Sequence, residues 1–241
     1  MANTILIASG KGGVGKSSLT VGLCRAMVSL GKRVLAVDCD VGLRSLDVLL
    51  HTGDSLVFDW GDAAAERCEA ERAILHIDSF DLLAAPLHLS DDFDPELLKK
   101  LIQKLDDAYD YIFLDAPAGV TGDFAIAATA AEAALIVSTP DALCLRSAGI
   151  AADTLRSLGV TEQRLVLNRF QKMAVRNNFL VSIDDAIDRT GVQLIGVVPE
   201  DPEVTFRLPK GEPLPKKSPA KLAYERIAKR VDGKRVPLKI V

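Results

Sequence analysis

A glycine-rich segment near the amino terminus carries two lysines followed by two serines. In order, it consists of Gly10, Lys11, Gly12, Gly13, Val14, Gly15, Lys16, Ser17 and Ser18. Its first eight residues fit the pattern G-x-x-x-x-G-K-[ST] and stand between an aliphatic run and a helical pattern, as that motif requires. The glycines allow a tight turn that points backbone N–H groups inward, and the helix after the loop adds its positive amino-terminal end. This arrangement predicts a site for a nucleoside triphosphate.

Three side chains of this loop have separable tasks. Lys16 is expected to bridge the β- and γ-phosphate oxygens, and the Ser17 hydroxyl to ligate Mg²⁺. The backbone N–H and hydroxyl of Ser18 are expected to reach the α-phosphate. The alternative, a glycine-rich turn without a ligand, is disfavoured by the position of the motif between a strand and a helix.

Carboxylates end two other aliphatic runs. Asp38 ends the run 33–38 and Asp40 follows two residues later, while Asp115 ends the run 111–115. The carboxyl ends of parallel strands lie at one edge of a sheet, so these acids are expected beside the phosphate-binding loop. The alternative for each is a solvated acid that caps a turn.

The rest of the chain alternates strand and helix patterns. Short aliphatic runs predict seven strands, at 4–9, 33–38, 80–84, 111–115, 134–138, 164–168 and 193–198. Longer amphipathic patterns predict helices at 16–30, 95–108, 143–158, 179–190 and 220–231. This alternation predicts one α/β domain, with a mostly parallel, twisted sheet of about seven or eight strands and helices on both faces. We place the domain at 1–231 and a short basic tail at 232–241.

Composition supports this fold class. The 241 residues are 49% hydrophobic but only 5% aromatic, which is typical of aliphatic strands buried between helices and excludes disorder for most of the chain. The net charge is −4, yet residues 207–241 hold 11 basic and 3 acidic residues, so this segment is +8 and the rest −12. Four dispersed cysteines and three dispersed histidines predict buried free thiols and argue against a zinc or iron–sulfur site. The sequence lacks a signal-peptide pattern, so we expect a cytosolic protein.

Lys11 narrows the interpretation, because an ordinary phosphate-binding loop has no need of a second lysine. The segment 9–18 resembles the deviant Walker A motif of the MinD/ParA family of ATPases. Residues 37–47, VDCDVGLRSLD, resemble the switch segment of the MinD branch, and residues 114–119, LDAPAG, resemble its Walker B and second switch. Residues 199–204 resemble the adenine loop of the family, and residues 211–213 resemble the segment after that loop. The resemblance covers nearly the whole chain.

The resemblance implies a P-loop ATPase fold, ATP or ADP with Mg²⁺ as cofactors, and a homodimer that forms with ATP. It implies that Asp38 bonds water in the Mg²⁺ shell, that Asp115 holds the metal through water and that Asp40 orients the attacking water. Lys11 would reach the partner's nucleotide, which makes Lys11, Lys16 and Asp40 the catalytic set. Asn168 and Arg169, with Pro199 and Glu200, would contact adenine. Arg44 has either a switch or dimer role or that of a surface charge.

The resemblance implies a positioning switch of the MinD type, driven by slow hydrolysis that an activating or cargo protein controls. The alternative is a ParA-like ATPase that binds DNA non-specifically. A metallocluster ATPase would need paired cysteines, which are absent.

Two departures from the family pattern limit the resemblance. The tail contains Gly233 and Pro237 and no aromatic residue, so we expect weak electrostatic contact with anionic membrane or nucleic acid rather than membrane insertion, and at most a peripheral membrane location. Ser147, Ala148 and Gly149 stand where the family commonly has aspartates used by partners.

Overall fold

The computed structural model describes residues 2–77, 79–90, 92–120 and 122–239, apart from the side chain of Asp54. Within these ranges eight strands form one sheet, in the order β3-β4-β2-β5-β1-β6-β7-β8. All neighbours pair in parallel except β3 and β4. The strands are β1 (Asn3–Ala8), β2 (Val34–Asp38), β3 (Ile74–Ile77), β4 (Phe80–Leu83), β5 (Tyr111–Asp115), β6 (Ala133–Ser138), β7 (Glu162–Phe170) and β8 (Leu194–Pro199). The predicted mostly parallel α/β sheet is confirmed.

All seven strands expected from the sequence are present, and β3 is the one that the sequence did not predict. It has four residues, of which three are half-buried and one is exposed. It pairs antiparallel with β4 at the edge of the sheet. A run this short lacks the buried aliphatic character by which the other strands were identified.

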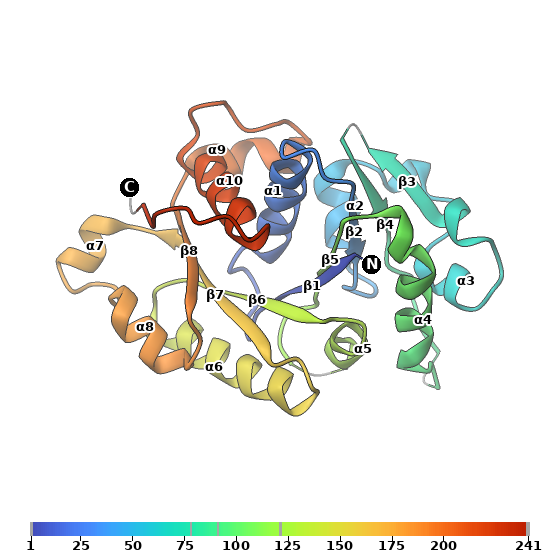
Figure 1. Ribbon diagram of the computed structural model, residues 1–241, viewed down its shortest axis with the longest axis horizontal. Helices are drawn as coiled ribbons and strands as arrows, with labels where there is room; N and C mark the ends of the chain where they lie inside the picture. Colours follow the sequence, from blue (N-terminus) through green and yellow to red (C-terminus); the bar gives the residue numbers. More distant parts are fainter. Residues whose placement is uncertain (1, 78, 91, 121, 240–241) are drawn as a thin grey trace.

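Helices cover both faces of the sheet (Figure 1). One hydrophobic core includes apolar residues of α1 and α10, and the other includes apolar residues of α4, α5, α6 and α8. The helices are α1 (Lys16–Val28), α2 (Ser45–Leu50), α3 (Trp60–Ala64), α4 (Pro95–Leu105), α5 (Asp123–Thr129), α6 (Ala142–Ser157), α7 (Lys172–Arg176), α8 (Ile183–Thr190), α9 (Pro202–Arg207) and α10 (Pro219–Val231). No helix of the described residues is long and apolar enough to cross a membrane.

The five predicted helices are α1, α4, α6, α8 and α10, and local chemistry sets their ends. Asp94 caps α4 by accepting a hydrogen bond from the Glu96 N–H, with Pro95 in the first turn, as expected. The prediction 179–190 began too early. Helix α8 begins at Ile183, because the Ser182 side chain accepts from the Asp185 N–H and thereby caps it. The five helices not predicted have only five to seven residues, too few to show a periodic pattern.

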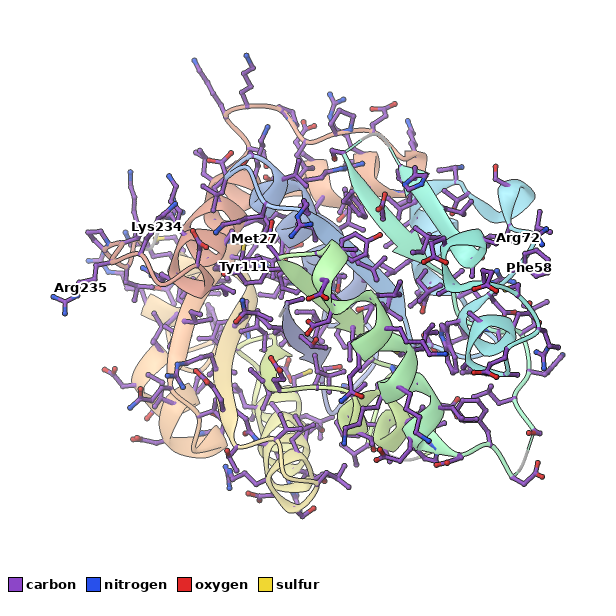
Figure 2. All side chains as sticks on the ribbon, turned by 45° about the vertical axis from the view of Figure 1, so that its right-hand side comes forward. Met27, Phe58, Arg72, Tyr111, Lys234 and Arg235 are labelled. Atoms are coloured by element: carbon purple, nitrogen blue, oxygen red, sulfur yellow. The ribbon has the colours of Figure 1, made fainter. Side chains whose placement is uncertain are left out.

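After α10, the described residues 232–239 form no helix. The first of these residues nevertheless packs on the domain. The Asp232 carboxylate lies 2.7 Å from Lys32 Nζ and accepts a 3.1 Å hydrogen bond from the Tyr111 hydroxyl. Arg235 extends outward at the side of the molecule (Figure 2). The basic residues beyond Asp232, namely Lys234, Arg235 and Lys239, are exposed.

Candidate functional site

The phosphate-binding loop connects the carboxyl end of β1 to α1, as the sequence predicts. Gly13 and Gly15 have positive φ angles of 78° and 94°, which favour glycine. Gly10 has a different reason to lack a side chain, since a Cβ there would lie 1.9 Å from the Ser147 carbonyl oxygen of α6. Gly12 does not adopt positive φ, and a Cβ there would make ordinary contact with Ala118. Of the four glycines of the loop, Gly13 and Gly15 are thus favoured by backbone conformation, and Gly10 is required by the close approach of α6.

The two lysines of the loop lie in opposite environments. Lys16, the first residue of α1, is 8% exposed. Burial lowers the pKa of its ammonium group, and the nearby carboxylates of Asp115 and Asp40 oppose this shift. Lys11 is exposed. One loop therefore holds a buried cation within its own site and presents a second cation at the surface.

Asp38 and Asp115 are brought together by strand pairing. They end the neighbouring strands β2 and β5 and are direct register partners, and both are buried. The Asp38 carboxylate accepts from the backbone N–H groups of Asp40, at 2.9 Å, and Leu46, at 2.7 Å. Burial, and next the charge of Asp115, raises the pKa of Asp38 to about 8.

Asp115 has a similar environment with different partners. Its Oδ1 accepts a 2.9 Å hydrogen bond from the Thr20 hydroxyl, while Oδ2 is buried with no hydrogen-bond partner among the described residues. Burial raises the pKa of Asp115 to about 6, opposed by Ser17, Lys16 and Thr20. Three carboxyl groups, those of Asp38, Asp40 and Asp115, share the site with the ammonium group of Lys16, so the site lacks positive charge whenever the carboxyl groups are ionised.

These residues fit a magnesium ion. Mg²⁺ prefers oxygen ligands, and a buried carboxylate oxygen without a partner is a group that such a cation or its water satisfies. No three His, Cys, Asp or Glu side chains in the described ranges converge closely enough to hold a metal by themselves. The geometry is compatible with the expected roles, in which the Ser17 hydroxyl would ligate Mg²⁺ beside the nucleotide phosphates and Asp38 and Asp115 would act through its water.

The segment after β2 holds Asp40 and Arg44. Asp40 is half-buried, and its Oδ2 accepts a 3.1 Å hydrogen bond from the Ser45 hydroxyl. Arg44 has a left-handed backbone with φ 52°, and its Nε lies 2.9 Å from Asp47 Oδ2. Its side chain is only 15% exposed, so the alternative of a surface charge does not hold. A switch or dimer role for Arg44 stays a prediction.

A cavity of about 190 Å³ lies beside the phosphate-binding loop at the carboxyl ends of β7 and β8. Its lining includes the four residues that the resemblance assigns to adenine, namely Asn168, Arg169, Pro199 and Glu200, and also Ser18, which is expected at the α-phosphate. Asn168 is buried, and its Nδ2 donates a 2.7 Å hydrogen bond to the Val14 carbonyl oxygen. One of its two N–H donors is therefore used within the protein, and its carbonyl oxygen remains as an acceptor.

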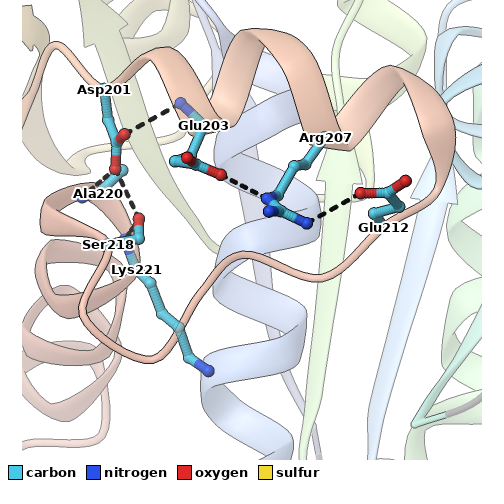
Figure 3. A network of polar contacts seen from close by, with 7 residues as sticks. All are labelled: Asp201, Glu203, Arg207, Glu212, Ser218, Ala220 and Lys221. Atoms are coloured by element: carbon cyan, nitrogen blue, oxygen red, sulfur yellow. Dashed lines mark hydrogen bonds and ion pairs between the residues drawn. The ribbon is translucent and has the colours of Figure 1, made fainter.

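A capping network fixes the elements around this cavity (Figure 3). Asp201, which lines the cavity, caps α9 by accepting from the Glu203 N–H at 3.1 Å. Its other oxygen accepts from the Ser218 hydroxyl at 2.6 Å and from the Ala220 N–H at 3.2 Å, at the start of α10. Arg207 joins Glu203 and Glu212 by ion pairs. One buried carboxylate thus holds α9, and with it the cavity wall, against α10.

Sequence reasoning missed several residues of the site. Asp201 with Pro202 repeats the cap that was identified at Asp94 and Pro95, so a local signal for α9 existed. Tyr224, which also lines the cavity, lies far along the chain and had no local signal. Thr20 lies within the helical pattern of α1, and nothing in that pattern indicates that its hydroxyl donates a hydrogen bond to Asp115. Three of the four free cysteines are buried as expected, and Cys68 is half-buried.

Known proteins resemble the chain along most of its length. Residues 5–214 match the family described as the CobQ/CobB/MinD/ParA nucleotide binding domain. The septum site-determining protein MinD of Synechocystis is 35% identical over 244 aligned residues, which cover 98% of this chain and 92% of that protein. The corresponding protein of Bacillus subtilis is 34% identical, over 100% of this chain and 93% of its own.

Solved structures agree with this similarity. A chain of the MinC:MinD cell division protein complex of Aquifex aeolicus has a TM-score of 0.92 at 35% identity, covering 99% of each chain. MinD of Pyrococcus horikoshii, complexed with Mg-ADP, has a TM-score of 0.85 at 29% identity and covers 96% of each chain. A ParA family ATPase of Chlorobium tepidum, at 22% identity and a TM-score of 0.78, shares the fold.

Proposed function

The chain belongs to the CobQ/CobB/MinD/ParA family and is a MinD-like, Mg²⁺-dependent positioning ATPase, and we propose that an ATP-dependent homodimer forms its switch. In this proposal each subunit closes over its partner's nucleotide, hydrolysis separates them, and an activating or cargo protein sets the rate. The chain spans over nine-tenths of the curated MinD proteins cited above. The ParA-like alternative has only a shared fold in its favour.

The observation that carries the dimer proposal is the contrast between the two lysines. Lys16 is buried and can serve the nucleotide of its own subunit, whereas Lys11 is exposed in the same loop. Two nucleotides that meet face to face bring their phosphates into a poorly hydrated interface, where unpaired negative charge is costly. A lysine that reaches the partner's phosphates offsets their negative charge. It also stabilises the charge that develops on the phosphate oxygens during hydrolysis.

Within each subunit the site residues divide the work. Mg²⁺, when bound, neutralises charge on the phosphates. Ser17 would ligate it, while Asp38 and Asp115 would accept hydrogen bonds from its water. Asp40 would orient the attacking water, and Asn168 and Arg169 with Pro199 and Glu200 would hold adenine in the cavity beside the loop.

Subunit mixing tests the dimer. Lys11→Ala should bind ATP measurably, fail to dimerise and lose hydrolysis, while Asp40→Ala should bind ATP and accumulate as a dimer without hydrolysis. Mixed together they should recover hydrolysis, because one of the two sites combines an intact Asp40 with an intact Lys11 from the other subunit. A mixture that forms heterodimers yet stays inactive, or a Lys11→Ala protein that dimerises normally by light scattering, contradicts the proposal.

The basic tail supports weak binding to an anionic surface. It lies at the amino-terminal ends of the strands, opposite the nucleotide site. A cavity of about 580 Å³ lies at the starts of β7 and β8, lined by Arg164, Ile195, Arg230, Gly233, Lys234, Arg235, Val236 and Pro237. Each cation near an anionic membrane contributes about 1 kcal/mol. We expect weak binding to anionic vesicles or DNA that disappears at high salt, in titrations with ATP and with ADP. Vesicle binding that survives high salt would contradict this.

A further inference from the structure

Thr20 lies one turn after Lys16 in α1, and it is fully buried. Its Oγ1 is 3.1 Å from the Lys16 carbonyl oxygen and 2.9 Å from Asp115 Oδ1. A hydroxyl has one hydrogen, so it can donate to only one of these acceptors at a time. An ionised carboxylate is the stronger acceptor. The hydroxyl therefore donates to Asp115 when that side chain is ionised.

This contact leaves the two oxygens of Asp115 in unequal situations. Oδ1 accepts from Thr20, and Oδ2 is buried without a hydrogen-bond partner among the described residues. The Ser17 side chain also acts on this carboxyl group and lowers its pKa. A carboxylate held through one oxygen loses freedom to rotate, so its second oxygen keeps a fixed direction. The strand pairing places this group level with Asp38.

We propose that Thr20 is a positioning residue for magnesium, because its hydroxyl holds the Asp115 carboxylate so that Oδ2 is available to the cation's water. The proposal rests on the role proposed above for Asp115. Partners that orient metal-binding groups in this way typically change metal affinity by about 10–100-fold when they are removed. Thr20 would thus act on the metal without touching it.

The competing explanation is purely local. Threonines within helices often donate to the carbonyl oxygen four residues earlier, and such a bond has no consequence for a metal. Thr190 in α8 offers a matched control. It is buried, and its hydroxyl donates to the Ala186 carbonyl oxygen at 2.8 Å, far along the chain from the phosphate-binding loop.

The experiment compares ADP affinity with Mg²⁺ and with EDTA, by calorimetry on the full chain. Thr20→Val keeps the shape and removes the hydroxyl, so the gain in affinity from Mg²⁺ should fall by about 10-fold or more while affinity in EDTA stays the same. Thr20→Ser should keep most of the gain, and Thr190→Val all of it. A Thr20→Val protein with the wild-type gain, or a Thr20→Ser protein that loses as much as Thr20→Val, overturns the proposal.

Asp115→Asn separates this inference from the one on which it rests. If Asp115→Asn keeps the full gain from Mg²⁺, the metal role of Asp115 is wrong and the role of Thr20 with it. If Asp115→Asn loses the gain and Thr20→Val does not, only the inference about Thr20 is wrong. Adding Thr20→Val to Asp115→Asn should cost no further gain. Should Thr20→Val fail to fold, Thr20→Ala carries the same expectation with a smaller side chain.

Discussion

The phosphate end and the base end of the nucleotide site are built in different ways. At the phosphate end, charged side chains from three elements are buried together, and burial shifts the pKa values of Lys16, Asp38 and Asp115. At the base end, a cavity of about 190 Å³ is lined mostly by residues of β7, β8, α9 and α10, with Arg169 and Glu200 exposed at its border. The phosphate end should therefore depend on single charged groups, and the base end on where whole elements are held.

The largest effect should come from Lys16→Ala. The loop would keep its backbone N–H groups but lose the buried cation that offsets the β- and γ-phosphates, so ATP binding should be abolished. Lys11→Ala, in the same loop, is the matched control and should retain measurable ATP affinity in the isolated subunit. Calorimetry with ATP and Mg²⁺ measures the affinity of both variants. Equal losses of ATP affinity would contradict the idea that Lys16 serves its own subunit and Lys11 the partner subunit.

Gly15→Ala should have the next largest effect, because Gly15 lies where the two ends meet. Its φ is 94°, and a Cβ would lie 2.3 Å from Asn168 Nδ2. Gly13→Ala is the matched control, since it has φ 78° and open space around its Cβ position. We expect Gly13→Ala to lower the free energy of unfolding by roughly 1–2 kcal/mol from backbone strain alone. Urea unfolding should show a clearly larger loss of unfolding free energy for Gly15→Ala. Equal losses in the two variants would show that the Asn168 side chain moves aside without cost.

The pH dependence of stability should follow the buried carboxylates. Their raised pKa values, about 8 for Asp38 and about 6 for Asp115, mean that the folded, metal-free protein binds protons that the unfolded chain has released. This contribution to stability should therefore be complete only below about pH 4, where the unfolded chain is protonated as well. It should be lost as the pH rises from there, through about 6 for Asp115 and about 8 for Asp38, by at most about 1.4 kcal/mol per pH unit for each proton.

Urea unfolding at pH 5, 6, 7 and 8 in EDTA measures this slope. Mg-ADP should add more stability at pH 8 than at pH 6, because the carboxylates are then ionised and available to the metal's water. Asp115→Asn should show a shallower slope than the wild type. Stability in EDTA that rises across this range would mean that the acids are not buried together as described.

The smallest effect on binding should come from Asp201→Ala at the base end. Removing this cap loosens α9 against α10 without removing a phosphate contact, so ATP affinity should fall only a few-fold and tripolyphosphate affinity should not change. Asp94→Ala removes a similar cap from α4, away from the site, and should leave ATP affinity unchanged. If Asp201→Ala weakens tripolyphosphate as much as ATP, the two ends are not independent.

The sequence determined the features that depend on local spacing. The phosphate-binding loop, the aliphatic strands and the acids at strand ends are each specified by residues close together in the chain, so Lys16, Asp38 and Asp115 could be identified. Caps such as Asp94 with Pro95 fixed helix ends for the same reason. The deviant loop with Lys11 was enough to indicate the family.

The tertiary structure decided which distant groups meet. Strand order places β5 between β1 and β2, and only this makes Asp115 the register partner of Asp38. The contact of Thr20 with Asp115, the bond from Asn168 to the Val14 carbonyl and the pairing of Arg44 with Asp47 likewise depend on side-chain packing. Local patterns report propensity over a few residues, whereas these contacts are selected by the packing of whole strands and helices, which leaves no signal at the residues themselves.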